Sequence, residues 1–385
     1  MLERWRKDKK SGSGDVWTDY LQWASRPTEL AQCQDFRPLL EQKPFQALYQ
    51  LAMSGEAQGQ QVLKQLAGAL GELDGFQRAL AAHLCGALIE HWGMNPAADQ
   101  RIVEAFAEMV VQSCEFLACA QAQLGCREEE FDEAKLREAD WGALFAQEPD
   151  RTRAFWGCDL LTLAVMAVIT RDQAARLLLR DKGIYQHLDY LVQFKEKVHY
   201  VQEVYQACPQ MAITVLAPKT GHGLRLLIND INNCFHLFTL LEAEFYHRGW
   251  LDDLEGYQWR RDIDQIAKGL VLPQTDASIT AHQQYYTVQA VQPDGSYQVT
   301  IQTEQGLQID PAALVWGEMP PEAIVPFAGE RIIIVDKEGM FAGRSWDISF
   351  IVKCHDALQP DLQVKEVLSE AECQTLWEKI KQRQA

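Results

Sequence analysis

The sequence predicts an α+β protein: a large, mainly helical N-terminal domain, then a small antiparallel β module, then a C-terminal helix. Two observations carry this prediction. Apolar residues recur every three or four positions through almost all of 16–270, which is the period of an amphipathic helix. After Pro273 the period changes to alternation, which is typical of strands. The expected parts are a flexible tail at 1–14, a helical domain at 15–272, an antiparallel β module at 280–356 and a C-terminal helix at 365–383.

The first half of the helical domain carries clear start and stop signals. Asn95-Pro96 is typical of a helix N-terminus, and the apolar stripe behind it runs until Gly125. The stretch from Phe155 to Thr170 is the most apolar of the chain, but it contains Asp159 and is too short to span a bilayer. It is predicted to be a buried core helix.

Two longer helices are expected next. Apolar residues repeat at helical spacing from Leu188 to Tyr205, before Pro209, and again from Leu224 to Phe245, before Gly249. In the β module, the alternating runs on either side of the turn 293–295 predict a hairpin, and 331–336 and 346–352 predict further strands. Ser369 and Glu372 form a capping-box pattern that starts the final helix.

Composition narrows the class of function. The 385 residues include 54 acids and 36 bases, for a formal charge of −18. A surface this acidic repels phosphate backbones and anionic lipid, so no nucleic-acid or membrane partner is expected, whereas a basic protein suits it. No apolar secretory run follows the charged start, and the ten cysteines include no Cys-x-x-Cys. Reduced cysteines in a cytoplasmic protein are therefore expected.

Two acidic stretches are candidate partner-binding sites. Exposed aromatic rings beside carboxylates suit a basic partner, because the ring supplies buried area and the carboxylates steer the encounter. The structural alternative is that these residues cap helices and face solvent. The candidate residues are Trp250, Asp252, Asp253, Glu255 and Tyr257 in one stretch, and Glu128, Glu129, Glu130 and Asp132 in the other.

No catalytic residue, metal ion or cofactor is expected, although an enzymatic alternative stays open. Glu196/His199 and Glu244/His247 are Glu-x-x-His pairs, which di-iron helical bundles use as ligands. They lie beside the apolar stripes rather than within them, which favours surface residues. A thiol hydrolase is a further alternative. The glycine turn 219–223 is interpreted as a plain turn, with a phosphate site as its alternative.

The last half of the chain resembles an immunity protein of a bacterial toxin–immunity pair, of the kind that accompanies type VI secretion effectors. The resemblance runs from the segment 224–236 through Trp250 to Trp259 and into the β module. Such proteins share no residue signature, so no family site is carried over. The resemblance implies a cytoplasmic, non-enzymatic inhibitor, monomer or homodimer, that binds a cognate basic toxin. A nuclease toxin fits best, blocked at its active site or in its assembly. A structural scaffold joined through the β module is the remaining alternative.

Overall fold

The computed structural model describes residues 16–251, 261–270, 279–283, 287–297, 300–303, 306–309, 313–336, 344–348 and 354–384. The predicted tail at 1–14 lies outside them. The chain forms two compact units, Met1–Tyr205 (unit 1) and Gln206–Ala385 (unit 2). The predicted α+β class is confirmed: helices predominate, and a small mixed sheet and a C-terminal helix follow.

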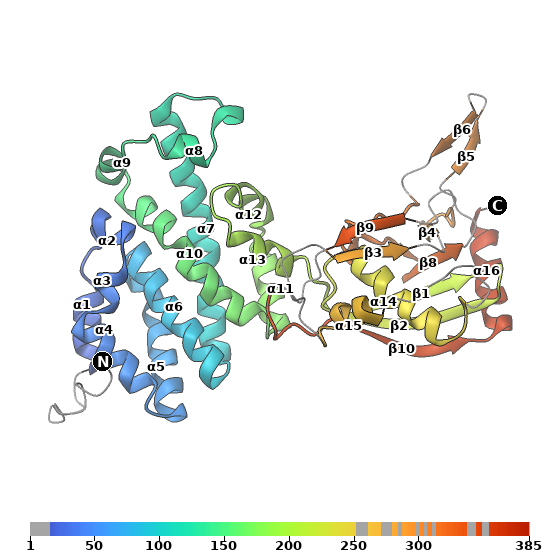
Figure 1. Ribbon diagram of the computed structural model, residues 1–385, viewed down its shortest axis with the longest axis horizontal. Coiled ribbons are helices and arrows are strands. Elements are labelled where there is room, and N and C mark those ends of the chain that lie inside the picture. The colour runs from blue at the N-terminus through green and yellow to red at the C-terminus, as the bar shows by residue number, and fades with distance from the viewer. Residues whose placement is uncertain are drawn as a thin grey trace. The chain divides into compact units, whose positions relative to one another are not determined.

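The described residues of unit 1 form helices joined by short turns (Figure 1). The α-helices are α1 Val16–Ala24, α2 Leu30–Gln34, α3 Arg37–Leu40, α4 Lys43–Ala52, α5 Glu56–Ala69, α6 Gly75–Trp92, α7 Pro96–Leu124, α8 Glu133–Leu136, α9 Trp141–Gln147, α10 Pro149–Ile169, α11 Gln173–Asp181, α12 Tyr185–Leu191 and α13 Val198–Tyr205, and the 3-10 helices are η2 Leu70–Glu72 and η3 Glu128–Glu130.

The centre of unit 1 is a close contact between α6 and α10. A Cβ atom added at Gly86 of α6 would lie 2.8 Å from the Cα of Ala164 in α10, and one added at Gly157 would lie 2.8 Å from the Cβ of Ala79. Small residues at the contact let the two helix backbones approach each other. Buried residues lie on most sides of both helices.

The helix α10 confirms the predicted buried core helix. It is the one described helix that is long and apolar enough to cross a membrane, but 83% of its most apolar window is buried inside the protein. Length and composition alone do not distinguish a core helix from a membrane span, and burial favours the core helix.

The predicted start and stop of α7 are confirmed at Pro96 and at Gly125, whose φ of 61° is left-handed. The expected helix 188–205 is instead divided into α12 and α13. Between them, Lys195 is buried, with its Nζ 3.1 Å from Asp159 Oδ2 and 4.2 Å from the ring centroid of Phe155. These contacts hold the intervening turn on α10, which helical spacing alone does not reveal.

Unit 2 combines a sheet with helices. The strands are β1 Met211–Ala217, β2 His222–Asn229, β3 Ile279–Gln283, β4 Thr287–Ala290, β5 Thr300–Thr303, β6 Gly306–Ile309, β7 Pro326–Phe327, β8 Glu330–Asp336, β9 Arg344–Ile348 and β10 Asp361–Leu368, and the helices are α14 Cys234–His247, α15 Arg261–Ala267, η4 Pro321–Ala323 and α16 Glu370–Gln384.

The main sheet has the order β10-β2-β1-β8-β4, with β7 paired to β8. The pair β1–β8 is parallel and the other pairs are antiparallel. Alternate residues face opposite layers: Ile333 packs with α14 and α15, whereas Ile332 and Ile334 pack with α16. The main sheet thus lies between two helical layers (Figure 1).

Three expectations for this part of the chain are wrong. Residues 222–229 form a strand, because Leu224, Leu226 and Ile228 are buried on one face while Arg225 is exposed. The strand β4 pairs with β8 rather than with the run beyond the turn 293–295, and β5 pairs with β6. The pair β1–β8 is parallel, so the sheet is mixed rather than antiparallel.

The expected boundaries of the helical domain and of the C-terminal helix also differ from those in the structure. The division between the units falls after Tyr205 rather than near 272, because β1 and β2 belong to the sheet of unit 2. The expected C-terminal helix 365–383 begins at Glu370, and 361–368 is an edge strand. Its capping box is confirmed, since Ser369 N donates to Glu372 Oε2 at 2.8 Å.

Replacing Gly86 with alanine tests the contact between α6 and α10. The added methyl meets backbone at 2.8 Å, which a side-chain rotation cannot relieve. Overpacking of this kind costs about 1–3 kcal/mol, and the helix propensity of alanine offsets at most about 1 kcal/mol. We expect G86A to lower the free energy of opening of unit 1, measured by amide hydrogen exchange in α6 and α10.

The matched control is Gly68→Ala in α5, where an added Cβ meets nothing within 4 Å. We expect this variant to stabilise unit 1 by about 0.5–1 kcal/mol. Equal stability of the two variants would show that the α6–α10 distance does not depend on Gly86.

Candidate functional site

Residues 127–140 (the acidic segment) connect α7 to α9 in unit 1 and include η3 and α8 (Figure 1). It carries seven acids and three bases. Its apolar residues fix it to the unit: Phe131 is 5% exposed with its ring centroid 5.1 Å from that of Phe194, and Leu136 and Ala139 are buried. The charged side chains are therefore held on an anchored backbone.

Several carboxylates of the acidic segment have structural partners. Asp132 accepts a hydrogen bond from Lys135 N at 2.8 Å and caps α8, and Asp140 accepts one from Ala143 N at 3.0 Å and caps α9. For Asp132 this is the structural role weighed above, although the side chain remains exposed.

Ion pairs occupy three further acids of this segment. Arg127 binds Glu130, and the hydrogen bond between them holds the pKa of Glu130 below its usual value. Lys135 lies 2.5 Å from Glu138. Arg137 likewise lies 2.6 Å from Glu133.

This leaves Glu128 and Glu129 exposed and without an ion-pair partner among the described residues. They are the carboxylates of the segment that remain available to an external cation.

An aromatic residue that sequence reasoning missed packs on the same Phe194 ring as Phe131 of the segment. Tyr190 of α12 is half-buried, and its ring centroid is 5.6 Å from that of Phe194. Burial, then the thiol of Cys114 and the carboxylate of Glu128, raise the pKa of its phenol. The 62-residue separation in sequence gives no signal that Tyr190 and Glu128 interact.

The second predicted site begins at Trp250 in unit 2. The indole of Trp250 stacks with His222 at 4.3 Å between centroids and with Phe245 at 5.5 Å. It also packs against the core between the sheet and α14. Much of the ring is therefore used inside unit 2. Asp252, Asp253, Glu255 and Tyr257 lie outside the described residues.

The two Glu-x-x-His pairs lie in different units. Glu196 and His199 are exposed in unit 1, and Glu196 precedes α13 rather than lying on a helix. In α14, Glu244 pairs with Arg248 at 3.2 Å, and His247 is exposed. Across the part of the chain that the structure describes, no three His, Cys, Asp or Glu side chains are arranged to hold a metal ion.

The glycine turn 219–223 is a hairpin turn between β1 and β2, with Gly221 at φ 71°. A strand, rather than a helix N-terminus, follows it, so the arrangement that binds phosphate at a helix N-terminus is not formed there.

The cysteines are thiols in the described structure. Burial raises the pKa of Cys158 to about 11 and those of Cys33 and Cys114 to about 12, and it also raises the pKa values of Cys85, Cys234 and Cys373. A thiol nucleophile requires the opposite shift, so these six residues do not fit a thiol hydrolase.

Comparisons with protein-family models, with curated proteins and with solved structures found no match.

The buried His236 makes the stability of unit 2 depend on pH. Its Nε2 lies 2.7 Å from the carbonyl oxygen of Ala267, which joins α14 to α15. Burial, opposed by this hydrogen bond, lowers its pKa from 6.5 to about 4. Between about pH 4 and pH 6.5, His236 is protonated in the unfolded chain and neutral in the folded unit. We therefore expect unit 2 to lose up to about 3 kcal/mol as the pH falls from about 6.5 to about 4.

His236→Gln keeps an amide donor near the position of Nε2 and removes the titration. In urea unfolding at about pH 7 and about pH 4.5, we expect a smaller loss of stability for H236Q than for the wild type. Identical losses in the two proteins would assign the pH dependence to other groups.

Proposed function

We propose that the protein is a non-enzymatic inhibitor that binds a basic protein, specifically an immunity protein that neutralises a nuclease toxin in the cytoplasm. The net charge of −18 supports a basic partner. The raised thiol pKa values, and the described residues' lack of a metal-ligand cluster, give no support to either enzymatic alternative.

The observation that carries the proposal is the pair Glu128 and Glu129. They are exposed and unpaired on a segment anchored by Phe131, and Tyr190 contacts the same Phe194 ring as Phe131. An anchored carboxylate loses less conformational entropy on binding than one on a free loop. Exposed carboxylates attract a cationic partner over a distance set by salt, and the phenol ring supplies contact area.

The experiment measures association with the product of the neighbouring gene, which the proposal expects to be a basic toxin. We expect Glu128→Lys/Glu129→Lys to reduce the association rate constant about tenfold or more at low salt, because the local charge changes from −2 to +2 at the contact. At high salt the difference should shrink, since screening removes the long-range attraction. Surface plasmon resonance over a salt series gives both quantities.

The matched control is Glu41→Lys/Glu72→Lys. Both residues are exposed acids of unit 1 without an ion-pair partner among the described residues, and the variant changes net charge by the same amount. It should retain most of the association rate. Equal slowing by both double variants would contradict a contact at the acidic segment, and a neighbouring product that does not bind the protein would contradict the immunity function.

A further inference from the structure

One carboxyl group of unit 1 is buried without a partner. Asp99 lies in the first turn of α7 and is 1% exposed. Neither of its carboxyl oxygens accepts a hydrogen bond from the described residues, and neither is in an ion pair with them. A buried carboxylate without such partners is costly, because it has lost its hydration and nothing replaces it. The core of unit 1 therefore favours the neutral acid.

The side chains around Asp99 supply no positive charge. Burial, opposed by the backbone N–H of Asn95 and reinforced by the carboxylate of Asp172 at the start of α11, raises its pKa from 3.8 to about 6. From α6, the buried thiol of Cys85 interacts with it, and burial together with Asp99 raises the pKa of that thiol. Among the described residues, no lysine, arginine or histidine interacts with Asp99.

A second buried polar group lies near the same thiol. The phenol of Tyr20 in α1 is fully buried, its oxygen has no hydrogen-bond partner among the described residues, and Cys85 acts on it electrostatically. A phenol, a thiol and a carboxyl group from three helices therefore occupy this part of the core. Buried polar groups that lack partners destabilise the packing around them, so this region tolerates a new charge poorly.

The connection between α6 and α7 lies directly before Asp99. It consists of residues 93–95 and begins at Gly93, whose φ of 92° is left-handed. The side chain of Gln60 in α5 holds it: Nε2 donates to Gly93 O at 3.1 Å, and Oε1 accepts from Asn95 Nδ2 at 3.3 Å. Hydrogen bonds to a partly exposed side chain exchange readily with water. The start of α7 can therefore open locally while the centre of unit 1 stays folded.

We propose that Asp99 is a proton-dependent switch for the start of α7. With the proton bound, the neutral acid stays in the core and the connection between α6 and α7 stays closed. When the proton leaves, the carboxylate gains hydration by local opening of residues 93–99, which admits water between α6 and α7.

The direction of this switch is opposite to that of His236 in unit 2. A carboxyl group with a raised pKa stabilises the closed state only while it is protonated, so the contribution of Asp99 is complete below about pH 3.8 and is lost as the pH rises through about 6. Acidification therefore closes the start of α7 in unit 1, whereas it weakens unit 2.

Amide hydrogen exchange of the full chain at about pH 5 and about pH 7, corrected for intrinsic exchange rates, tests the proposal. We expect the protection of residues 98–103 to fall about tenfold in the wild type, because about one unit of this interval lies below the raised pKa of Asp99 and each such unit changes the opening equilibrium tenfold. Asp99→Asn keeps the shape and has no proton to lose, so its protection should not change with pH. Carbon-13 NMR should show one carboxyl group that titrates near pH 6 and is absent from D99N.

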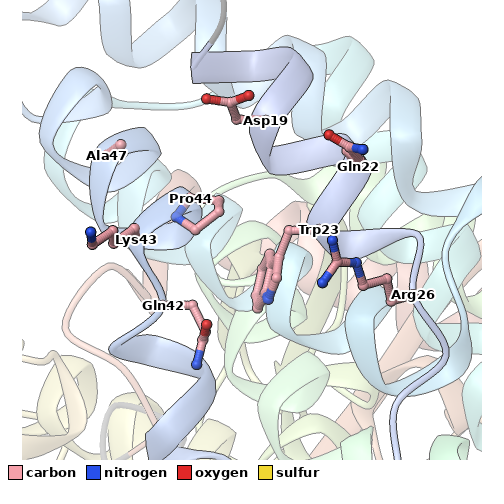
Figure 2. A pocket seen from close by; sticks show the side chains of 8 residues that line it. All are labelled: Asp19, Gln22, Trp23, Arg26, Gln42, Lys43, Pro44 and Ala47. Atoms are coloured by element: carbon pink, nitrogen blue, oxygen red, sulfur yellow. The ribbon is translucent and has the colours of Figure 1, made fainter. Parts of the chain in front are cut away.

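The matched control is Asp19→Asn. Asp19 also lies in the first turn of a helix, but it is exposed and lines a surface hollow between α1 and the start of α4, where water replaces the missing partner (Figure 2). This variant should keep the pH dependence of the wild type. The proposal is overturned if D99N retains the tenfold change, if Asp19→Asn abolishes it, or if every carboxyl group titrates below about pH 5. These outcomes do not involve Glu128, Glu129 or a protein partner, so the test is independent of the proposed function.

Discussion

The arrangement of unit 1 depends on the close contact between α6 and α10. Because Gly86 faces the backbone of Ala164, the two helices approach more closely than larger side chains allow. This contact fixes α10, and α10 in turn presents Phe155, Trp156 and Asp159 on its outer flank. The ammonium group of Lys195 lies against all three, at 4.2 Å and 5.7 Å from the two ring centroids and 3.1 Å from the carboxylate.

Lys195 connects this core to the acidic segment. A buried ammonium requires compensation for its lost hydration, and the carboxylate of Asp159 and the two aromatic rings supply it. The adjacent Phe194 is thereby placed against Phe131, the main apolar anchor of the segment. The position of Glu128 and Glu129 therefore depends on the packing of Phe131 against Phe194 and on the contacts that the adjacent Lys195 makes with α10. The position of α10 depends in turn on its contact with α6. An acidic loop without such an anchor would present the same charges without a fixed geometry.

The sequence predicts the local features of this molecule well and its long-range pairings poorly. The limits of α7, the buried α10 and the Ser369 capping box follow from residues close together in sequence. The strand β2 was missed because its apolar residues also fit a helical spacing, and only its pairing with β1 and β10 selects the strand. For the candidate site, the sequence identifies the acids, but which of them remain unpaired depends on Arg127, Lys135 and Arg137. Tyr190 joins them only through tertiary packing.

The distribution of unpaired charges says more about where this protein can bind a charged partner than its net charge does. Most of the acids in the acidic segment are neutralised by bases three or four residues away or serve as helix caps, and such pairs contribute little to stability at an exposed surface. Within this segment, pairing fails at Glu128 and Glu129, which therefore present its unneutralised negative charge.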